Sequence, residues 1–266
     1  MAKPLTESGD AAPQDEASSL AEDGFSTDAL LGGRLRLRQP VTGYRAAIDP
    51  VLLAAAVPAA PRDLVCEAGA GAGAALLCLA ARVPGCRILG FERDDSLVQL
   101  ARDNAADNGF SDRVEVVAGD IAKPPPRLSP GTFDHVMMNP PYLESSRARS
   151  PVDANRAAAM VEGQAGLGDW IGFAHVMLRD RGTLTIIHRA DRLDQLLAAL
   201  ASRFGGVTVF PLWPGEGRGA KRVIVRARKN TKEPASLLPG LVLHGDDGRF
   251  TPAAEAILRE GHGLDF

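Results

Sequence analysis

The spacing of hydrophobic and polar residues divides the chain, from residue 63 onward, into short apolar runs that alternate with longer amphipathic segments. Short apolar runs bounded by Gly, Pro or Asp are typical of buried strands, and longer Ala/Leu-rich segments are typical of helices. The predicted strands are 64–67, 87–92, 114–118, 133–139, 183–188, 206–211 and 222–228, and the predicted helices are 72–82, 94–108, 169–178 and 191–204. This alternation predicts an α/β fold with helices on both faces of a doubly wound, Rossmann-like, mostly parallel sheet.

The linker between the last two predicted strands, residues 212–221, is short and rich in Gly and Pro. A parallel pair of strands needs a crossover of about a dozen residues or more, which is usually helical. We therefore expect these two strands to form an antiparallel hairpin at one edge of the sheet.

The two ends of the chain differ from this central part. Residues 1–28 contain one basic and seven acidic residues, a net charge of -6, with few large apolar side chains. Such a segment cannot bury enough surface to offset its ordering entropy, so it is predicted to be a disordered acidic tail. The central domain is expected at 29–230. Residues 231–266 are expected to form a C-terminal extension, with a hairpin at 240–250 and a short helix at 252–260.

Composition narrows the class of protein. The chain has 266 residues, of which 45% are hydrophobic and 24% charged, as in ordinary globular proteins. Because the whole chain carries -3, the residues after the acidic tail carry +3, which is compatible with nucleic acid but does not require it. The three cysteines and five histidines lack metal-ligand spacing, and no apolar run is long enough to span a bilayer. We expect a cytoplasmic protein without metal or membrane partners.

A glycine-rich turn, Gly69-Ala70-Gly71-Ala72-Gly73, joins the first predicted strand of the sheet to its helix. Glycines let the backbone approach a ligand closely, and the helix amino end offers free N–H groups. The G-x-G-x-x-A spacing, together with Glu92 at the end of the next strand, also fits the dinucleotide fingerprint of nicotinamide enzymes. The turn alone leaves both kinds of cofactor open.

Two further acidic residues favour a cofactor without phosphate. Glu67 precedes the glycines, where a carboxylate would repel a pyrophosphate but suits an ammonium group. Asp120 follows the third strand and can accept from an adenine amine, with Ile121 against the ring. Together with Glu92 for the ribose, these residues fit S-adenosylmethionine. The predicted cofactor-binding set also includes Arg93, beside Glu92, and Asn139.

The motif Asn139-Pro140-Pro141-Tyr142 follows the fourth predicted strand of the sheet. Its two prolines stiffen the turn and remove backbone donors, which leaves the Asn139 side-chain oxygen and the Pro140 carbonyl free to accept from an amine. Tyr142 offers a flat face on which a base could stack. The motif therefore predicts the acceptor half of a group-transfer site, although a rigid turn capped by Asn is the simpler alternative.

These motifs together resemble the class I S-adenosylmethionine-dependent amino-methyltransferases. Segment 38–54 is in addition similar to the bacterial tRNA(Val) (adenine-N6)-methyltransferases, and the resemblance covers roughly residues 33–230. It implies a seven-stranded sheet with one reversed strand. It also implies that the segment around Gly43, Tyr44 and Asp49 folds over the cofactor, although Asp49 could simply cap a helix that begins at Pro50.

The expected reaction is methyl transfer to the exocyclic N6 of adenine in tRNA. Within the same class, a protein glutamine N5-methyltransferase of release factors is the alternative, because a primary amide presents the same NH2 group. In other classes, the alternatives are an NAD-dependent oxidoreductase and an RNA-binding protein with a vestigial pocket. Several basic residues could follow an RNA backbone or could simply cover solvated edges: Arg34, Arg36, Arg38, Arg147, Arg149, Arg156, Arg218, Lys221, Arg222, Arg226, Arg228 and Lys229.

Overall fold

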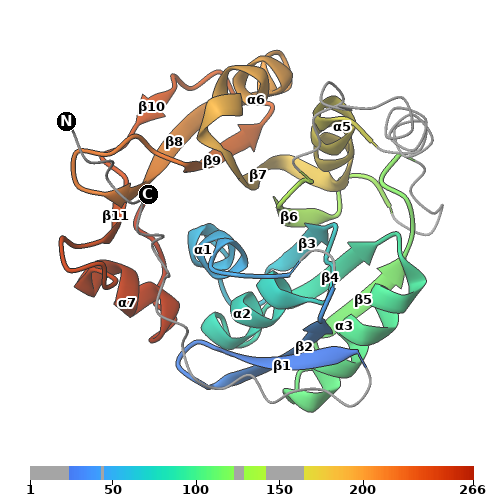
Figure 1. The fold of residues 1–266 in the computed structure, drawn as a ribbon. Helices are drawn as coiled ribbons and strands as arrows, with labels where there is room; N and C mark the ends of the chain where they lie inside the picture. Colours follow the sequence, from blue (N-terminus) through green and yellow to red (C-terminus); the bar gives the residue numbers. More distant parts are fainter. Residues whose placement is uncertain (1–23, 43–44, 123–128, 142–164) are drawn as a thin grey trace, which may run out of the picture.

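The computed structural model describes residues 24–42, 45–122, 129–141 and 165–266, which form a central sheet with helices on both faces (Figure 1). The strands are β1 (Phe25–Leu30), β2 (Leu35–Pro40), β3 (Leu64–Ala68), β4 (Arg87–Glu92), β5 (Val114–Ala118), β6 (Phe133–Met138), β7 (Leu178–Arg189), β8 (Phe204–Gly215), β9 (Arg222–Lys229), β10 (Ser236–Leu237) and β11 (Leu241–His244). The helices are α1 (Asp49–Ala56), α2 (Ala74–Arg82), α3 (Asp95–Asp107), α5 (Leu167–Met177), a 3-10 turn at Ala190–Arg192, α6 (Leu193–Leu200) and α7 (Pro252–Leu258).

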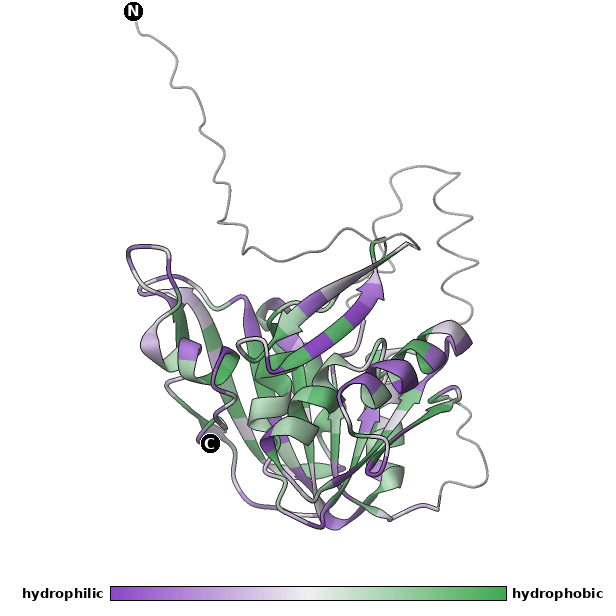
Figure 2. Ribbon diagram, turned by 90° about the horizontal axis from the view of Figure 1, so that it is seen from below, coloured by the Kyte–Doolittle hydropathy of each residue, from purple (hydrophilic) through white to green (hydrophobic). Residues whose placement is uncertain are grey.

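The main sheet confirms the predicted doubly wound topology. Its strand order is β10-β8-β9-β7-β6-β3-β4-β5, and the strands from β5 to β7 pair in parallel. One apolar cluster lies between the sheet and helices α1, α2 and α3, and a second lies between the sheet and helices α5 and α6. The central strands are mostly hydrophobic in Figure 2, as expected for strands buried on both faces.

The predicted antiparallel hairpin is confirmed, but its outer strand β8 also pairs with β10 and β11 and so is not the edge of the sheet. Strands β8 and β9 are antiparallel, and β9 is also antiparallel to β7, with Arg222 opposite Arg189. This register places the β8–β9 turn at the carboxyl end of β7, beside the carboxyl end of β6.

The amino-terminal boundary differs from the prediction. Strand β1 begins at Phe25, so residues 25–28 are part of a hairpin with β2 rather than part of a tail. Ser26 is buried and Asp28 forms a salt bridge with Arg45, at 2.7 Å. The acidic composition hid this strand because its apolar support comes from Leu35 and Leu37 of β2. The rest of the predicted tail, residues 1–23, lies outside the described residues.

The C-terminal extension joins the sheet, which has nine strands rather than seven. The predicted hairpin at 240–250 is wrong, because β11 pairs in parallel with β8 and only an isolated bridge joins His244 to Phe250. Strand β10 also pairs with β8. The predicted helix is confirmed as α7. The last residue, Phe266, stacks on Phe210 at 5.1 Å between ring centroids.

Candidate active site at the carboxyl ends of the strands

A cleft of about 940 Å³ lies where strands β3, β4, β5 and β6 end. Open α/β sheets bind ligands at this edge because the carboxyl-end loops and helix amino ends converge there. The residues that line it come from the β1–β2 hairpin, the glycine-rich loop, the strand ends and the start of α5: Gln39, Pro40, Thr42, Ala46, Pro50, Glu67, Gly69, Ala70, Gly71, Ala72, Ala74, Ala75, Phe91, Glu92, Arg93, Asp94, Ser96, Leu97, Gly119, Asp120, Ile121, Asn139, Pro140, Pro141, Ala165 and Trp170.

The glycine-rich loop takes the left-handed backbone that its sequence allows. Gly69, Gly71 and Gly73 have φ values of 72°, 54° and 92°. The Gly69 N–H donates to the Phe91 carbonyl at 2.7 Å, which ties the loop to β4. A Cβ on Gly69 would come within 2.5 Å of the Trp170 ring, so glycine is required for close packing as well as for conformation. Gly73 is the N-cap of α2 and does not line the cleft.

Glu92 holds the loops on either side of it. Its carboxylate accepts from the Gly71 N–H at 2.9 Å, the Arg93 N–H at 2.7 Å and the Asp94 N–H at 3.0 Å. These bonds fix the carboxylate at the carboxyl end of β4, where the sequence predicted a ribose-binding acid. Asp94 is the N-cap of α3 and accepts from Ser96 and Leu97.

Glu67 is the most unusual group in the cleft, because it is a carboxyl with only 4% of its surface exposed. Its Oε2 atom is buried without a hydrogen-bond partner among the described residues. Burial raises the pKa of Glu67 well above its ordinary value, and the nearby Glu92 charge adds to the rise. A buried acceptor of this kind fits a cationic ligand group that is not part of the protein.

The other predicted residues close the same cleft. Asp120 accepts from the Ala122 N–H at 2.9 Å, and Ile121 lines the wall beside it. Met138 at the end of β6 pairs with Ala68 of β3, so Asn139 leaves the sheet at the same edge as Gly69, which is two residues after Glu67. Pro140 is buried and Pro141 is exposed. The predicted Tyr142 lies outside the described residues.

Asp49 does not have the position predicted for it. It is the first residue of α1, where Ile48 rather than Asp49 is the N-cap, and it does not line the cleft. Its carboxylate accepts from the Arg222 guanidinium of β9 at 2.9 Å. Only the following residue, Pro50, reaches the cleft, so a direct cofactor contact from Asp49 stays a prediction without support in this geometry. Gly43 and Tyr44 lie outside the described residues.

Two groups of lining residues were not predicted. Gln39, Pro40, Thr42 and Ala46 form a wall from the β1–β2 hairpin and the loop after it, and Trp170 forms part of the wall at α5. The similarity of segment 38–54 pointed to the first group, without assigning a role to Gln39. Nothing local in the sequence marks Trp170, because its contact with Gly69 joins residues far apart in the chain.

The basic residues divide into paired and unpaired groups. Arg226 lies over the Phe266 ring at 4.0 Å, Arg228 pairs with Glu233, and Lys229 donates to the Leu178 carbonyl. These three are held by the protein itself. Arg218 and Lys221, in the β8–β9 turn, are exposed and form no salt bridge with any described residue. The predicted Arg147, Arg149 and Arg156 lie outside the described residues.

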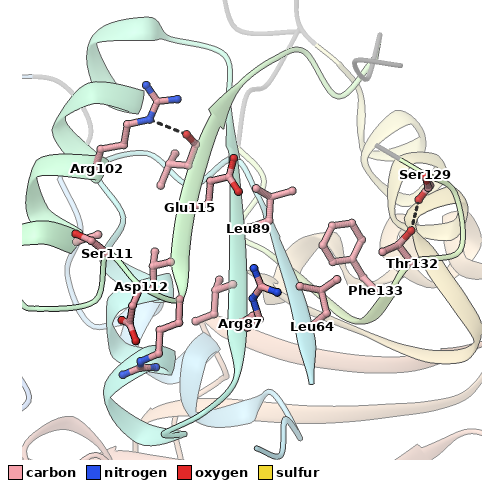
Figure 3. A pocket seen from close by; sticks show the side chains of 15 residues that line it. Leu64, Arg87, Leu89, Arg102, Ser111, Asp112, Glu115, Ser129, Thr132 and Phe133 are labelled. Carbon is pink, nitrogen blue, oxygen red and sulfur yellow. Dashed lines mark hydrogen bonds between the residues drawn. The ribbon is translucent and has the colours of Figure 1, made fainter. Parts of the chain in front are cut away.

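A second hollow, of about 660 Å³, lies at the opposite end of the same strands (Figure 3). It is lined by the first residues of four strands: Leu64, Arg87, Val114 and Phe133. It contains none of the predicted site residues. Its side chains also satisfy the backbone nearby, because Arg102 donates to the Val116 carbonyl at 2.8 Å and Thr132 donates to the Ser129 carbonyl at 2.6 Å.

Within residues 24–42, 45–122, 129–141 and 165–266, no three His, Cys, Asp or Glu side chains are grouped to hold a metal ion. No helix in these ranges has the length and apolar character needed to cross a membrane.

Comparison with known proteins gives a consistent result. A methyltransferase domain family matches residues 61–199. The chain is 34% identical to a tRNA1(Val) (adenine(37)-N6)-methyltransferase of Porphyromonas gingivalis, over 85% of this chain and 91% of that protein. It is 27% identical to the protein of the same name from Aeromonas hydrophila, over 76% and 84%.

Among solved structures, a predicted O-methyltransferase, Atu636 from Agrobacterium tumefaciens, matches with a TM-score of 0.68 and 28% identity, over 82% of this chain and 98% of that one. The matched segment 61–199 holds the glycine-rich loop, the three strand-end acids and Asn139-Pro140-Pro141. The chain therefore belongs to the methyltransferase domain family.

Proposed function

We propose that this protein is an S-adenosylmethionine-dependent methyltransferase that acts on the exocyclic N6 of adenine in tRNA. The observation that carries the proposal is the meeting of Glu67, Glu92, Asp120 and Asn139 in one cleft at the carboxyl edge of the sheet. The names of the related proteins from Porphyromonas gingivalis and Aeromonas hydrophila support tRNA adenine as the acceptor.

The cleft suits a cofactor that carries an ammonium group, a ribose and an adenine but no phosphate. The buried Oε2 of Glu67 would accept from the ammonium, and the Glu92 carboxylate would accept from the ribose hydroxyls. Asp120 and Ile121 would receive the adenine. A pyrophosphate on the glycine-rich loop would instead meet the Glu67 side chain, which weighs against a nicotinamide dinucleotide. When bound, the cofactor supplies a methyl group on a positively charged sulfur.

Asn139 and Pro140 would prepare the acceptor nitrogen. An exocyclic aromatic amine is a weak nucleophile because its lone pair is delocalised into the ring. The Asn139 side-chain oxygen and the Pro140 carbonyl would accept both of its N–H bonds, which favours a pyramidal nitrogen and stabilises the positive charge that develops on it. No strong base is needed, since the methylated amine becomes acidic and loses its proton to solvent. Alignment of amine and methyl group in the cleft supplies the remaining rate.

The unpaired cations give modest support for RNA over protein. The β8–β9 turn that carries Arg218 and Lys221 lies at the carboxyl end of β7, next to β6, which Asn139 directly follows. Exposed cations near an acceptor site can bind phosphates of the substrate backbone. A base in folded RNA must leave its stack to enter such a cleft.

Incubation of the protein with methyl-labelled cofactor and either total tRNA or total protein tests this function. We expect label in tRNA and its recovery as N6-methyladenosine after nuclease digestion. Label in release factors, recovered as N5-methylglutamine, would contradict the proposed substrate while leaving the reaction class intact. Binding of NAD(H) without binding of S-adenosylmethionine in calorimetry would contradict the reaction class itself.

A further inference from the structure

Two asparagines, Asn104 of α3 and Asn108 at its C-cap, hold the β1–β2 hairpin to that helix by hydrogen bonds. Asn104 and Asn108 are four residues apart and therefore lie on the same face of the helix. One edge of β2 pairs with β1. On the other edge, each asparagine faces the backbone of one β2 residue. Figure 1 shows the hairpin beside α3.

The two side chains make the same reciprocal pair with the strand. The Arg36 N–H donates to Asn108 Oδ1 at 3.0 Å, and Asn108 Nδ2 donates to the Arg36 carbonyl at 2.7 Å. The Arg38 N–H donates to Asn104 Oδ1 at 2.9 Å, and Asn104 Nδ2 donates to the Arg38 carbonyl at 2.9 Å. The amides thus take the place of a neighbouring strand and satisfy the edge of β2.

The two asparagines differ in the acceptor that the second N–H of the side-chain amide reaches. Asn108 Nδ2 donates to the Asn104 carbonyl at 2.7 Å, within its own helix. Asn104 Nδ2 donates at 2.9 Å to the carbonyl of Ala72, which lies between Gly71 and Gly73 in the glycine-rich loop. Asn104 is 1% exposed, so water cannot replace either bond. Its amide uses both donors and its acceptor on three backbone groups.

These contacts link two walls of the cleft. Ala72 lines the cleft from the glycine-rich loop, and Gln39 and Pro40, directly after Arg38, line it from the hairpin. Gln39 is 2% exposed, and its Oε1 accepts from the Ala46 N–H at 2.8 Å, so the loop after the hairpin is held through it. Asn104 is therefore a direct hydrogen-bonded link between the hairpin wall and the glycine-rich loop, in addition to the packing of Leu35 and Leu37 in the core.

We propose that Asn104 is a positioning residue of the cofactor cleft, which sets the distance between the hairpin wall and the glycine-rich loop. This inference rests on the proposed function for the identity of the cofactor. Asn104 does not touch the cofactor space itself, because it does not line the cleft. Its effect on binding passes through the backbone of Ala72 and Arg38.

Asn104→Ala and Asn108→Ala form a matched pair of variants. Both lose the reciprocal pair with β2, and both should unfold at a lower temperature than the wild type. Only Asn104→Ala loses the bond to the glycine-rich loop. We expect it to weaken S-adenosylmethionine binding by about tenfold or more, with kcat at saturating cofactor within a few-fold of wild type, whereas Asn108→Ala should bind within about twofold of wild type.

Calorimetric titration of each folded variant with S-adenosylmethionine measures the difference. Equal affinities for the two variants would overturn the proposal, because a merely structural role predicts lower stability for both and no selective loss of binding. If the wild type binds no S-adenosylmethionine at all, the proposed function has failed rather than the role of Asn104.

If Asn104→Ala does not fold, the wild-type protein labelled with 15N-asparagine provides the test. The side-chain amide resonances of Asn104 should shift when S-adenosylmethionine saturates the cleft, because their acceptor, the Ala72 carbonyl, belongs to a wall of that cleft. Those of Asn108 should shift much less. Unchanged Asn104 resonances at saturation would overturn the proposal.

Discussion

The two ends of the parallel sheet carry hollows of similar size but opposite character. At the carboxyl ends, about 940 Å³ is enclosed by glycine-rich backbone and contains the buried, unpartnered Oε2 of Glu67. At the amino ends, about 660 Å³ is bordered by Arg102 and Thr132, which donate to backbone carbonyls, and by Arg113, whose Nη1 is buried without a hydrogen-bond partner among the described residues. Asp134, at the same end of the sheet but outside the lining of this hollow, accepts from the Leu64 N–H at 2.8 Å and from Arg179 at 2.6 Å. The unpartnered group is a carboxyl in the first hollow and a guanidinium in the second, so the two hollows differ in the charge of the ligand group that they would fit.

The difference follows from the direction of the strands. Parallel strands all end at the same edge, where their loops lead into helix amino ends with free N–H groups. At the opposite edge, the chain enters the strands from helix carboxyl ends. The carboxyl edge thus gathers groups that need a ligand, and substitutions there should affect function far more than matched substitutions at the amino edge.

The largest effect is expected for Asn139→Ala. We propose that the Asn139 side-chain oxygen accepts a hydrogen bond from the substrate amine, so its loss should lower kcat by about 10²–10³-fold, as for loss of a group that stabilises transition-state charge. S-adenosylmethionine affinity should change little. Thr132→Ala, at the amino-end hollow, is the control and should retain wild-type kcat. Initial-rate measurements with tRNA decide this, and an Asn139→Ala rate within a few-fold of wild type would refute the role of Asn139.

The next effect concerns Glu92→Gln, with Glu115→Gln as its control at the amino-end hollow. Gln keeps the size of Glu92 but would lose the charge-assisted bonds proposed to the ribose hydroxyls, and it places an N–H group near other donors of the loop. Each such bond contributes about 1.5–3 kcal/mol, so S-adenosylmethionine should bind at least about tenfold more weakly. Calorimetric titration measures the affinity of each variant for S-adenosylmethionine. Equal affinities for Glu92→Gln and Glu115→Gln would show that the ribose is held elsewhere.

A smaller effect is expected for the double variant Arg218→Ala/Lys221→Ala. These exposed cations lie near the carboxyl edge, so their loss should weaken tRNA binding by about tenfold at low salt and make it less dependent on salt. Arg87→Ala, at the amino-end hollow, should leave both quantities unchanged. Binding titrations over a range of salt concentrations provide the measurement, and equal salt slopes for all three proteins would move the RNA surface away from the β8–β9 turn.

The sequence predicts the sheet and most of the cleft because their signals are local. The glycines around Gly71 and the acids Glu67, Glu92 and Asp120 each follow an apolar run, and parallel topology then brings the strand ends together. The antiparallel hairpin follows from the length of one linker.

The remaining features depend on contacts between distant parts of the chain. Trp170 enters the site by packing on Gly69, and Asp49 is turned to Arg222, 173 positions away. Asn104 looks like an ordinary polar residue of a helix until β2 is placed beside it. Likewise, β11 could pair with Phe250 or with β8, and only the packed edge of the sheet decides between them.

The smallest effect is expected in the pH dependence of thermal stability. Glu67→Gln and Asp134→Asn test it at two carboxyls from opposite ends of the sheet. Burial raises the pKa of Glu67, so the folded state favours its neutral form. Burial alone would also raise the pKa of Asp134, but the Leu64 N–H and Arg179 outweigh it, and that pKa is lowered. The two groups should therefore affect stability with opposite signs.

Glu67 contributes stability that is complete below its unfolded pKa and is lost as pH rises through its raised folded pKa. Glu67→Gln, which stays neutral, should therefore unfold at a higher temperature than the cofactor-free wild type at alkaline pH.

Asp134 contributes stability that is present above its unfolded pKa and is lost as pH falls through its lowered folded pKa. Asp134→Asn should therefore unfold at a lower temperature near neutral pH. Shifts of a few degrees, about 2–4 °C per kcal/mol, are expected in thermal unfolding from about pH 4 to pH 9. Saturating S-adenosylmethionine should reverse the advantage of Glu67→Gln, because in the proposed complex its ammonium would stabilise the Glu67 carboxylate. If both variants shift in the same direction at every pH, the contrast between the two ends of the sheet does not hold.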